Sequence, residues 1–432
     1  MKILICSRYF APQNTIGAVR PTMFAKYLSQ FGHEVTVITE KVADNNAYIN
    51  YSFEVIEVEG YKLATNIKQK RVNKTQSNVF ENKEQCKIKK LYIDFRRFTV
   101  GNLLDFLWFK KVKHCIGERM QGKHYDIVFS SYGPLSSFYI GQYIYKKNIA
   151  DFWVSDMRDL MINYLTPIIY YPLFKYYLYS MQKHASKITV VSQGQKNILK
   201  SFFRYKYIDD NIVVIYNGFT RIFRNHNFGD NTLRLIYTGT LYAHKSDMSI
   251  LFKAIWDLFI EDKIDINKIQ IHYAGADEET LKSLAVKYNL QRIVFGHGLI
   301  SRNDSFLLQE TADILLVCSW NLKNEQGILT GKFLEYLPMQ RPIIAMITGD
   351  SPKAELTSLI DELKVGISCE YVNYESDLLR LKNFILSAYE EKQKNGKVSY
   401  HGDVDNLKQF DYYYLTKKLE KLFTEVAYGR NN

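Results

Sequence analysis

The sequence lacks the cysteine pattern of a disulfide-bonded or zinc-binding protein. Its 432 residues include five cysteines, an odd number, and no two of them are spaced as CxxC. Disulfide frameworks pair an even number of cysteines, and structural zinc sites use closely spaced ones. We therefore expect neither a disulfide framework nor a zinc site, and the pattern fits a reducing compartment.

Targeting and membrane-spanning segments are lacking as well. The first residues, MKILICSRYF, contain only a short apolar stretch. A signal peptide needs a longer one, and a spanning helix needs a run of about 18 apolar residues that the chain does not contain. We expect a cytoplasmic protein that at most attaches to the inner face of a membrane from the side.

The charge is unbalanced toward lysine and arginine. The formal net charge is +12, whereas 47% hydrophobic and 24% charged residues are ordinary for a globular protein. A basic surface favours anionic partners, namely phosphates, nucleic acid or an acidic membrane. Because no nucleic-acid-binding motif and no basic-aromatic repeat is present, we do not expect nucleic acid to be the partner.

Short apolar runs alternate with longer helical patterns along the chain. We expect buried parallel strands at 2–7, 33–39, 125–131, 152–156 and 187–192, and a second series at 211–218, 234–240, 269–275, 292–298, 313–320 and 342–347. This alternation of strands and helices predicts βαβ units and an α/β fold of two Rossmann-like domains, each a doubly wound parallel sheet. The expected domains are 1–205 and 206–405, and 406–432 contains a terminal amphipathic helix.

Ligands of open α/β sheets bind outside the carboxyl ends of the strands. In the first domain, the loop SRYFAPQNTIGAVRP places Gly17 just before a helix that carries Arg20. Free N–H groups at such a helix start bind anions, although a turn glycine beside a solvated arginine explains the pattern equally well. The dinucleotide fingerprint GxGxxG is absent, so we expect no nicotinamide or flavin cofactor.

Three charged residues crowd the end of a later strand in the same domain. In SDMRDLM, Asp156 or Asp159 could accept a proton and Arg158 could orient it, with a structural Asp–Arg pair as the alternative. The spacing Asp-x-Arg-Asp is not the Asp-x-Asp of a divalent-metal anchor. We therefore predict a metal-independent site.

The second domain offers a set of small and cationic residues at its strand ends. Lysine and helix N–H groups together can cradle a diphosphate, and a carboxylate one turn deeper can accept hydrogen bonds from two adjacent hydroxyls, as on a ribose. An ordinary i,i+3 Lys–Glu surface pair, worth about 0.2–0.5 kcal/mol, explains the lysine but not the glycine-rich turn before it. The predicted binding residues are Gly239, Lys245, Gly327, Thr330, Gly331, Lys332 and Glu335.

The ordered set of motifs resembles glycosyltransferase family 4 of the GT-B fold, over nearly the whole chain. It is most similar to bacterial enzymes of surface-polysaccharide synthesis. The motifs that carry the resemblance are YFAPQNTIGAVRP…GHEVTVIT, YDIVFSSYGPLSS, DMRDLM, IYNGF, YTGTLY…K and GKFLEYLPMQRPIIA. In such enzymes the last helix crosses back to the N-terminal domain, which presents the acceptor, while the C-terminal domain grips the nucleotide diphosphate.

The resemblance also implies roles for individual residues. Glu335 would bind the ribose, Lys332 and Lys245 would neutralise the diphosphate, and the Gly17 loop would approach the transferred group. Arg20 and Arg158 would lie on the acceptor side, and Asp156 and Asp159 would occupy the strand end near the reaction centre.

The chain departs from the family pattern at three places. Gly327 stands where the family has another glutamate, with Glu325 as a nearby substitute, and Thr240 replaces an arginine beside the diphosphate. The histidine that many relatives use near the reaction centre is also absent. The donor-sugar contacts are the part of the site that these departures affect.

The function implied by the resemblance is retaining sugar transfer for capsule, O-antigen or exopolysaccharide synthesis. The donor would be a UDP- or GDP-linked sugar, and the acceptor a saccharide or lipid-linked saccharide. A sugar-nucleotide epimerase of the same fold and a non-catalytic anion-binding protein are the alternatives.

Two stretches of the first domain mix aromatic and basic residues. They are 94–120, which contains Lys110, Lys111 and Lys113, and 164–184. Such a face can lie in an anionic membrane interface, each lysine contributing about 1 kcal/mol, whereas core helices with solvated lysines are the alternative. An anionic membrane surface is therefore a further candidate partner.

Overall fold

The structure is a computed structural model of the chain. It describes residues 1–13, 15–42, 51–61, 83–163, 166–203, 210–219, 229–242 and 245–429, with the backbone alone at 83–94 and 97. The chain forms two compact units. The first comprises Met1–Val191, Lys196–Tyr216 and Tyr412–Asn432, and the second comprises Ser192–Gln195 and Asn217–Asp411.

The first unit is built on a seven-stranded parallel sheet in the order β3-β2-β1-β4-β5-β6-β7. The apolar runs form these strands because both faces of the sheet are covered, so that neighbouring residues of one strand serve opposite cores. Ile3 and Ile5 belong to one core, while Leu4 and Cys6 belong to the other. The strands are β1 (Lys2–Cys6), β2 (Glu34–Lys41), β3 (Glu54–Glu59), β4 (Tyr125–Tyr132), β5 (Ala150–Met157), β6 (Lys187–Val190) and β7 (Ile212–Val214).

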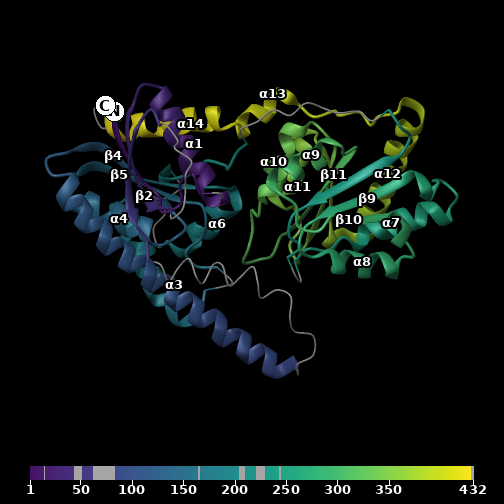
Figure 1. The fold of residues 1–432 in the computed structure, drawn as a ribbon, viewed down its shortest axis with the longest axis horizontal. Coiled ribbons are helices and arrows are strands. Elements are labelled where there is room, and N and C mark those ends of the chain that lie inside the picture. The colour runs from purple at the N-terminus through teal and green to yellow at the C-terminus, as the bar shows by residue number, and fades with distance from the viewer. Residues whose placement is uncertain are drawn as a thin grey trace. The chain divides into compact units, whose positions relative to one another are not determined.

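Helices cover both faces of this first sheet. One core contains side chains of α3 (Lys83–Arg119), α4 (Ser136–Lys146), α5 (Tyr171–His184) and α6 (Gln193–Phe202). The opposite core contains side chains of α1 (Ile16–Gln30) and of the last helix, α14 (Tyr412–Tyr428). Figure 1 shows α14 alongside α1, which it contacts closely. The predicted return of the C-terminal helix to the N-terminal domain is confirmed.

The second unit contains a six-stranded parallel sheet in the order β10-β9-β8-β11-β12-β13. The apolar core on one face of it includes residues of α7, α8 and α12. The strands are β8 (Leu233–Thr238), β9 (Ile269–Ala274), β10 (Val294–Gly296), β11 (Ile314–Trp320), β12 (Ile343–Thr348) and β13 (Gly366–Glu370). The helices are α7 (Ser249–Ile260), α8 (Glu278–Lys287), α9 (Arg302–Glu310), α10 (Gly331–Tyr336), α11 (Glu355–Leu363), α12 (Tyr374–Asn395) and α13 (Val404–Leu407).

Both sheets reverse their strand order at one place. In the first unit, β2 and β3 extend the sheet on one side of β1, and the strands after β4 extend it on the other side. In the second unit, β9 and β10 extend the sheet beside β8, and the strands after β11 extend it on the other side. Loops that leave the carboxyl ends of such a strand pair diverge to opposite faces and open a crevice between them. These two switch points are where the fold places its candidate sites.

The α/β class and the two parallel sheets are confirmed, but one strand was predicted in the wrong series. Residues 211–218 were expected to open the second series, whereas β7 pairs with β6 in the first sheet. An apolar pattern does not specify a neighbour, so a strand between two sheets is ambiguous in sequence. Strands β3 and β13 were not predicted.

Of the helices that the structure describes, none is long and apolar enough to cross a membrane.

Candidate functional site

Gly239 and Lys332 meet at the switch point of the second unit. Gly239 follows β8 with a φ of 134°, a conformation that side chains with a Cβ rarely adopt. A Cβ built on it would lie 3.0 Å from Cε of Lys332, so the lysine side chain passes directly over the end of β8. Gly239 and Lys332 are 93 positions apart in the sequence, yet they form one surface in the fold.

Lys332 and Glu335 form a polar cluster with Gln309, a residue that the sequence did not single out. The Lys332 ammonium donates to Oε1 of Glu335 at 2.7 Å, and Nε2 of Gln309 donates to the same oxygen at 2.7 Å. Oε2 of Glu335 has no hydrogen bond within the described part of the chain. The lysine keeps two further N–H donors and the glutamate keeps one acceptor oxygen.

Buried contacts hold this cluster against the end of β8. Gln309 has no exposed surface, and its Nε2 also donates to the Thr238 hydroxyl at 2.7 Å. The backbone N–H of Thr238 donates to the Tyr336 hydroxyl at 3.0 Å. Burial raises the pKa of Tyr336, so its hydroxyl stays neutral. Strand β8 and helices α9 and α10 thus fix the position of Glu335 together.

Lys245 lies in a second cluster of the same unit. Its ammonium is ion-paired with Glu325, which is nearly buried, and lies 4.5 Å from the centre of the Trp320 ring. The Trp320 indole N–H donates to Oε2 of Glu325 at 3.0 Å. Trp320 is the last residue of β11, and Glu325 lies in the segment that follows it. Glu325, the nearby substitute for the missing family glutamate, is therefore a direct partner of Lys245.

The glycine-rich turn leads into α10. Gly327 has a φ of 70°, Thr330 precedes the helix, and Gly331 is its first residue. The Thr330 hydroxyl is buried and has no hydrogen-bond partner among the described residues. This turn is what directs Lys332 back over Gly239, which explains the glycines that a surface ion pair left unexplained.

In the first unit, Asp156 and Arg20 form a buried pair. Nη2 of Arg20 donates to Asp156 at 2.8 Å, and neither side chain is more than 1% exposed. Thr189 and Ser131 donate to the same carboxylate at 2.7 and 2.8 Å. Burial alone would raise the pKa of Asp156, but the charge and hydrogen bonds of Arg20, Thr189 and Ser131 outweigh it and lower the pKa. This environment gives both residues a structural role below the surface.

Arg158 joins three loops at the carboxyl edge of the first sheet. Its guanidinium donates to the backbone carbonyls of Gly17, Tyr132 and Gly133. Tyr132 ends β4 and Gly133 follows it, Gly17 lies in the helix after β1, and Arg158 follows β5, so the arginine joins segments from the switch-point strands. Gly17 lies inside the first turn of α1 rather than before the helix as predicted. Arg158 therefore shapes this edge through the backbone.

Asp159, next to this arginine, is exposed. Its carboxylate makes no hydrogen bond or ion pair with any residue that the structure describes. The surrounding loops desolvate it and raise its pKa, an effect that the charge of Arg158 opposes. Of the two predicted carboxylates, Asp159 is the one on an exposed residue that no described residue engages through a hydrogen bond.

The structure therefore does not bring all of the predicted residues together. Gly239, Lys332 and Glu335 form one cluster, with Lys245 in a neighbouring loop region of the same unit, and Arg158, Asp159 and Gly17 adjoin at the edge of the other sheet. Across the described ranges, no three metal-ligating side chains come together. Cations beside a partly exposed carboxylate suit the binding of an anion that also carries hydroxyl groups.

The comparison with known proteins finds structural likeness only. No model of a protein family matches the sequence, and no curated protein matches it. Sucrose-phosphate synthase from Thermosynechococcus elongatus is similar in structure, with a TM-score of 0.62 at 12% identity over 98% of both chains. WaaG, a glycosyltransferase involved in lipopolysaccharide biosynthesis, has a TM-score of 0.54 at 12% identity over 98% of this chain and 99% of its own.

A third similar structure is S. aureus TarM, solved in complex with UDP. Its TM-score is 0.55 at 13% identity, over 98% of this chain and 100% of its own. At these identities the likeness establishes the fold. The GT-B fold predicted from the sequence is thereby confirmed.

Proposed function

We propose that the protein is a retaining glycosyltransferase that moves a sugar from a UDP- or GDP-linked donor to a saccharide or lipid-linked saccharide in surface-polysaccharide synthesis. The observation that carries the proposal is the Lys332–Glu335–Gln309 cluster over Gly239 at the switch point. The GT-B fold, which WaaG and TarM share, supports it. Retention and the pathway rest on the sequence resemblance.

The proposed chemistry follows from the hydrogen-bond donors and acceptors of the cluster that no other described residue uses. The two remaining N–H donors of Lys332 neutralise the diphosphate, whose negative charge grows as the sugar leaves. Oε2 of Glu335 accepts hydrogen bonds from the ribose hydroxyls. Lys245 supplies a second cation once the diphosphate competes with Glu325 for it. Preorganised charge of this kind lowers the barrier without a metal ion.

Asp159 is the proposed acceptor-side carboxylate. Its raised pKa and its position on an exposed residue suit a group that takes the proton of an attacking hydroxyl. Asp156 is proposed to act indirectly, by holding Arg20 beneath the same edge.

A membrane-facing surface is a second part of the proposal. Trp108, which lies within the stretch 94–120, is buried in the core, but Phe95, Leu103 and Phe106 on α3 are exposed. On and before α5, the exposed apolar residues are Ile168, Ile169, Leu173, Tyr176 and Tyr179. The side chains of Arg97, Tyr164 and Leu165 lie outside the described residues.

Charge complements this surface. Helix α5 contains no acidic residue, and the exposed Lys110 of α3 lies 5.1 Å from the Phe106 ring centre. We therefore expect sedimentation with anionic vesicles that high salt releases. Replacing Lys110, Lys111 and Lys113 by glutamine should weaken sedimentation and leave nucleotide binding unchanged. Failure of the wild-type protein to bind anionic vesicles at low salt would exclude this part of the proposal.

The central experiment measures ligand-induced stability and then turnover. A nucleotide sugar that binds the folded state at 100 times its Kd raises stability by about 2.7 kcal/mol, which a thermal scan detects readily. UDP, GDP and their common sugars should be screened in this way. The selected donor is then incubated with and without saccharide acceptors. Donor turnover that needs no acceptor would identify an epimerase, and no stabilisation by any nucleotide would reject the proposal.

A further inference from the structure

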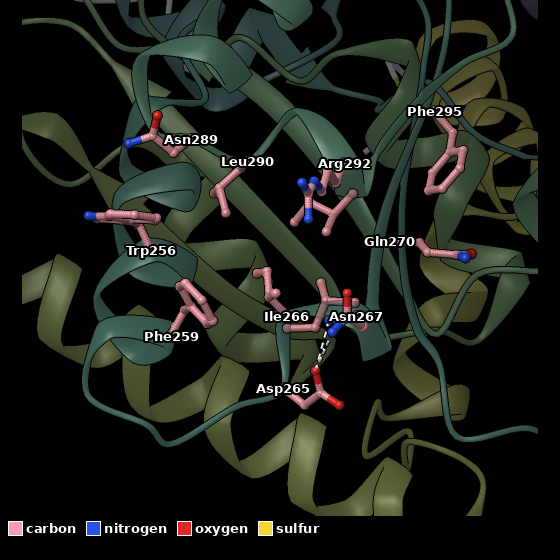
Figure 2. Close-up of a pocket in the computed structure, with 12 residues that line it drawn as sticks. Trp256, Phe259, Asp265, Ile266, Asn267, Gln270, Asn289, Leu290, Arg292 and Phe295 are labelled. Carbon is pink, nitrogen blue, oxygen red and sulfur yellow. Dashed lines mark hydrogen bonds between the residues drawn. The ribbon is translucent and has the colours of Figure 1, made fainter.

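A separate cavity lies at the amino-terminal edge of the second sheet. It has a volume of about 620 Å³ and is lined where α7 ends and where β9 and β10 begin (Figure 2). Strand β9 has six residues, so its two ends are roughly 17 Å apart. Gly239 and Lys332 lie at the carboxyl edge. The cavity is therefore distinct from the candidate nucleotide site.

Aromatic side chains form two walls of the cavity. Trp256 and Phe259 from α7 lie on one side and Phe295 of β10 on the other, with Arg292 between them (Figure 2). Trp256 and Phe259 are partly buried and their ring centres are 5.8 Å apart, whereas Phe295 is 40% exposed. Flat apolar surfaces of this kind pack well against the C–H faces of a pyranose ring.

Polar side chains with atoms that bond to no residue in the described ranges surround these rings. The Asp265 side chain uses only Oδ1, which accepts from Asn267 at 3.0 and 3.1 Å. Gln270 uses its Oε1 with His272 at 3.1 Å, which leaves Nε2. The side chains of Arg292 and Asn289 make no hydrogen bond with residues in the described ranges. The lining thus offers a carboxylate oxygen, a guanidinium and two amides to a ligand.

The ligand class follows from this combination. One acidic and one basic side chain nearly cancel, so a strongly charged ligand gains little. Vicinal hydroxyls match a carboxylate oxygen and a planar guanidinium, each of which makes paired hydrogen bonds. A cavity of several hundred Å³ with convergent polar groups is the size of small-molecule sites. We propose that this cavity binds a neutral saccharide, away from the site of transfer.

The inference is compatible with the proposed function but does not depend on it. A polymer-building enzyme would hold a growing chain there, yet the lining chemistry stands whether or not sugar transfer occurs. The glucose, galactose, mannose, rhamnose and N-acetylglucosamine series, as mono- to hexasaccharides, are the probes. Calorimetry and saturation-transfer NMR measure their binding to the full chain.

We expect at least one series to bind, and Trp256→Ala and Arg292→Ala to raise its Kd about tenfold or more. Tyr428→Ala and Arg119→Ala, which remove exposed side chains of the first unit, are the matched controls. Glu335→Gln should bind the saccharide as wild type does, which separates this cavity from the nucleotide site. Arg292 is exposed, so its variant tests the cavity even if Trp256→Ala misfolds.

Two results would overturn the inference. One is that no saccharide of the panel binds the wild-type protein. The other is that binding survives in both Trp256→Ala and Arg292→Ala, which would place the saccharide elsewhere on the chain.

Discussion

Replacing Glu335 by glutamine tests the nucleotide site with little disturbance of the fold. In the structure Lys332 and Gln309 both donate a hydrogen bond to the same oxygen of Glu335, Oε1. A glutamine there satisfies both of them with its carbonyl oxygen, and this orientation puts its NH₂ group at the position of Oε2. The variant keeps the local network and loses the acceptor that we assign to ribose hydroxyls.

The expected loss of nucleotide affinity follows from that single group. A hydrogen bond to a charged acceptor is worth about 1.5–3 kcal/mol, which is roughly ten- to a hundredfold in Kd. The accompanying loss of an i,i+3 ion pair changes the stability of the chain by about 0.2–0.5 kcal/mol. Nucleotide binding should therefore fall far more than the free energy of unfolding.

Calorimetric titration with the selected nucleoside diphosphate and its 3′-deoxy analogue measures this directly. Wild type should prefer the ribose form, and Glu335→Gln should bind both forms with similar, weak affinity. Asp257→Asn is the matched control, because Asp257 is a carboxylate of the same unit, also 20% exposed and also paired with a lysine of its own helix. Unchanged ribose preference in Glu335→Gln would refute the assignment of Glu335 to the ribose hydroxyls. Lys332 and Glu335 would then be an ordinary surface ion pair.

Four further predictions concern the first unit and the chemistry. Asp159→Asn should lower kcat by about 10²–10⁴ while the fold stays intact. An unchanged kcat would indicate that the departing diphosphate, and not Asp159, accepts the proton. Asp156→Asn should instead cost about 3–5 kcal/mol of unfolding free energy, measured in urea, because it leaves Arg20 buried without its counter-charge. Asp105 of α3 is buried and ion-paired with Arg8. Burial, opposed by this arginine, raises the pKa of Asp105 to about 6, so the folded state holds a proton that the unfolded chain releases. Between about pH 4 and 6 the wild type should therefore lose stability relative to Asp105→Asn as the pH rises, and a pH-independent difference would contradict this. Transfer should survive EDTA, and activity that is abolished by EDTA and restored by magnesium or manganese would disprove metal independence.

Much of the fold was predictable because its signals are local. A buried parallel strand is an apolar run, and a helix that covers it has its own periodicity, so the order of elements can be read along the chain. The strands that were missed or misplaced have weak local signals. Strand β3 is an edge strand with acidic residues at half of its positions, and β7 is only three residues long.

The candidate site was predictable only in part. Lys332 and Glu335 stand out because a glycine-rich turn precedes a charged pair at helical spacing. Gln309 gives no such signal, since a glutamine near the end of a polar helix is ordinary until the fold brings it against Glu335. Asp156 and Asp159 look alike in sequence, yet one is buried and ion-paired and the other faces solvent.

The sequence alone thus determined the alternation of strands and helices and the spacing of Lys332 and Glu335, because both depend on residues within a few turns of each other. Only the tertiary structure decided which strands are neighbours, and with that the meeting of Gly239 with Lys332 and of Arg20 with Asp156. It also decided that Trp256, Arg292 and Phe295 line one cavity. The physical reason is that strand order depends on the packing of helices over whole sheets, and no local pattern encodes it.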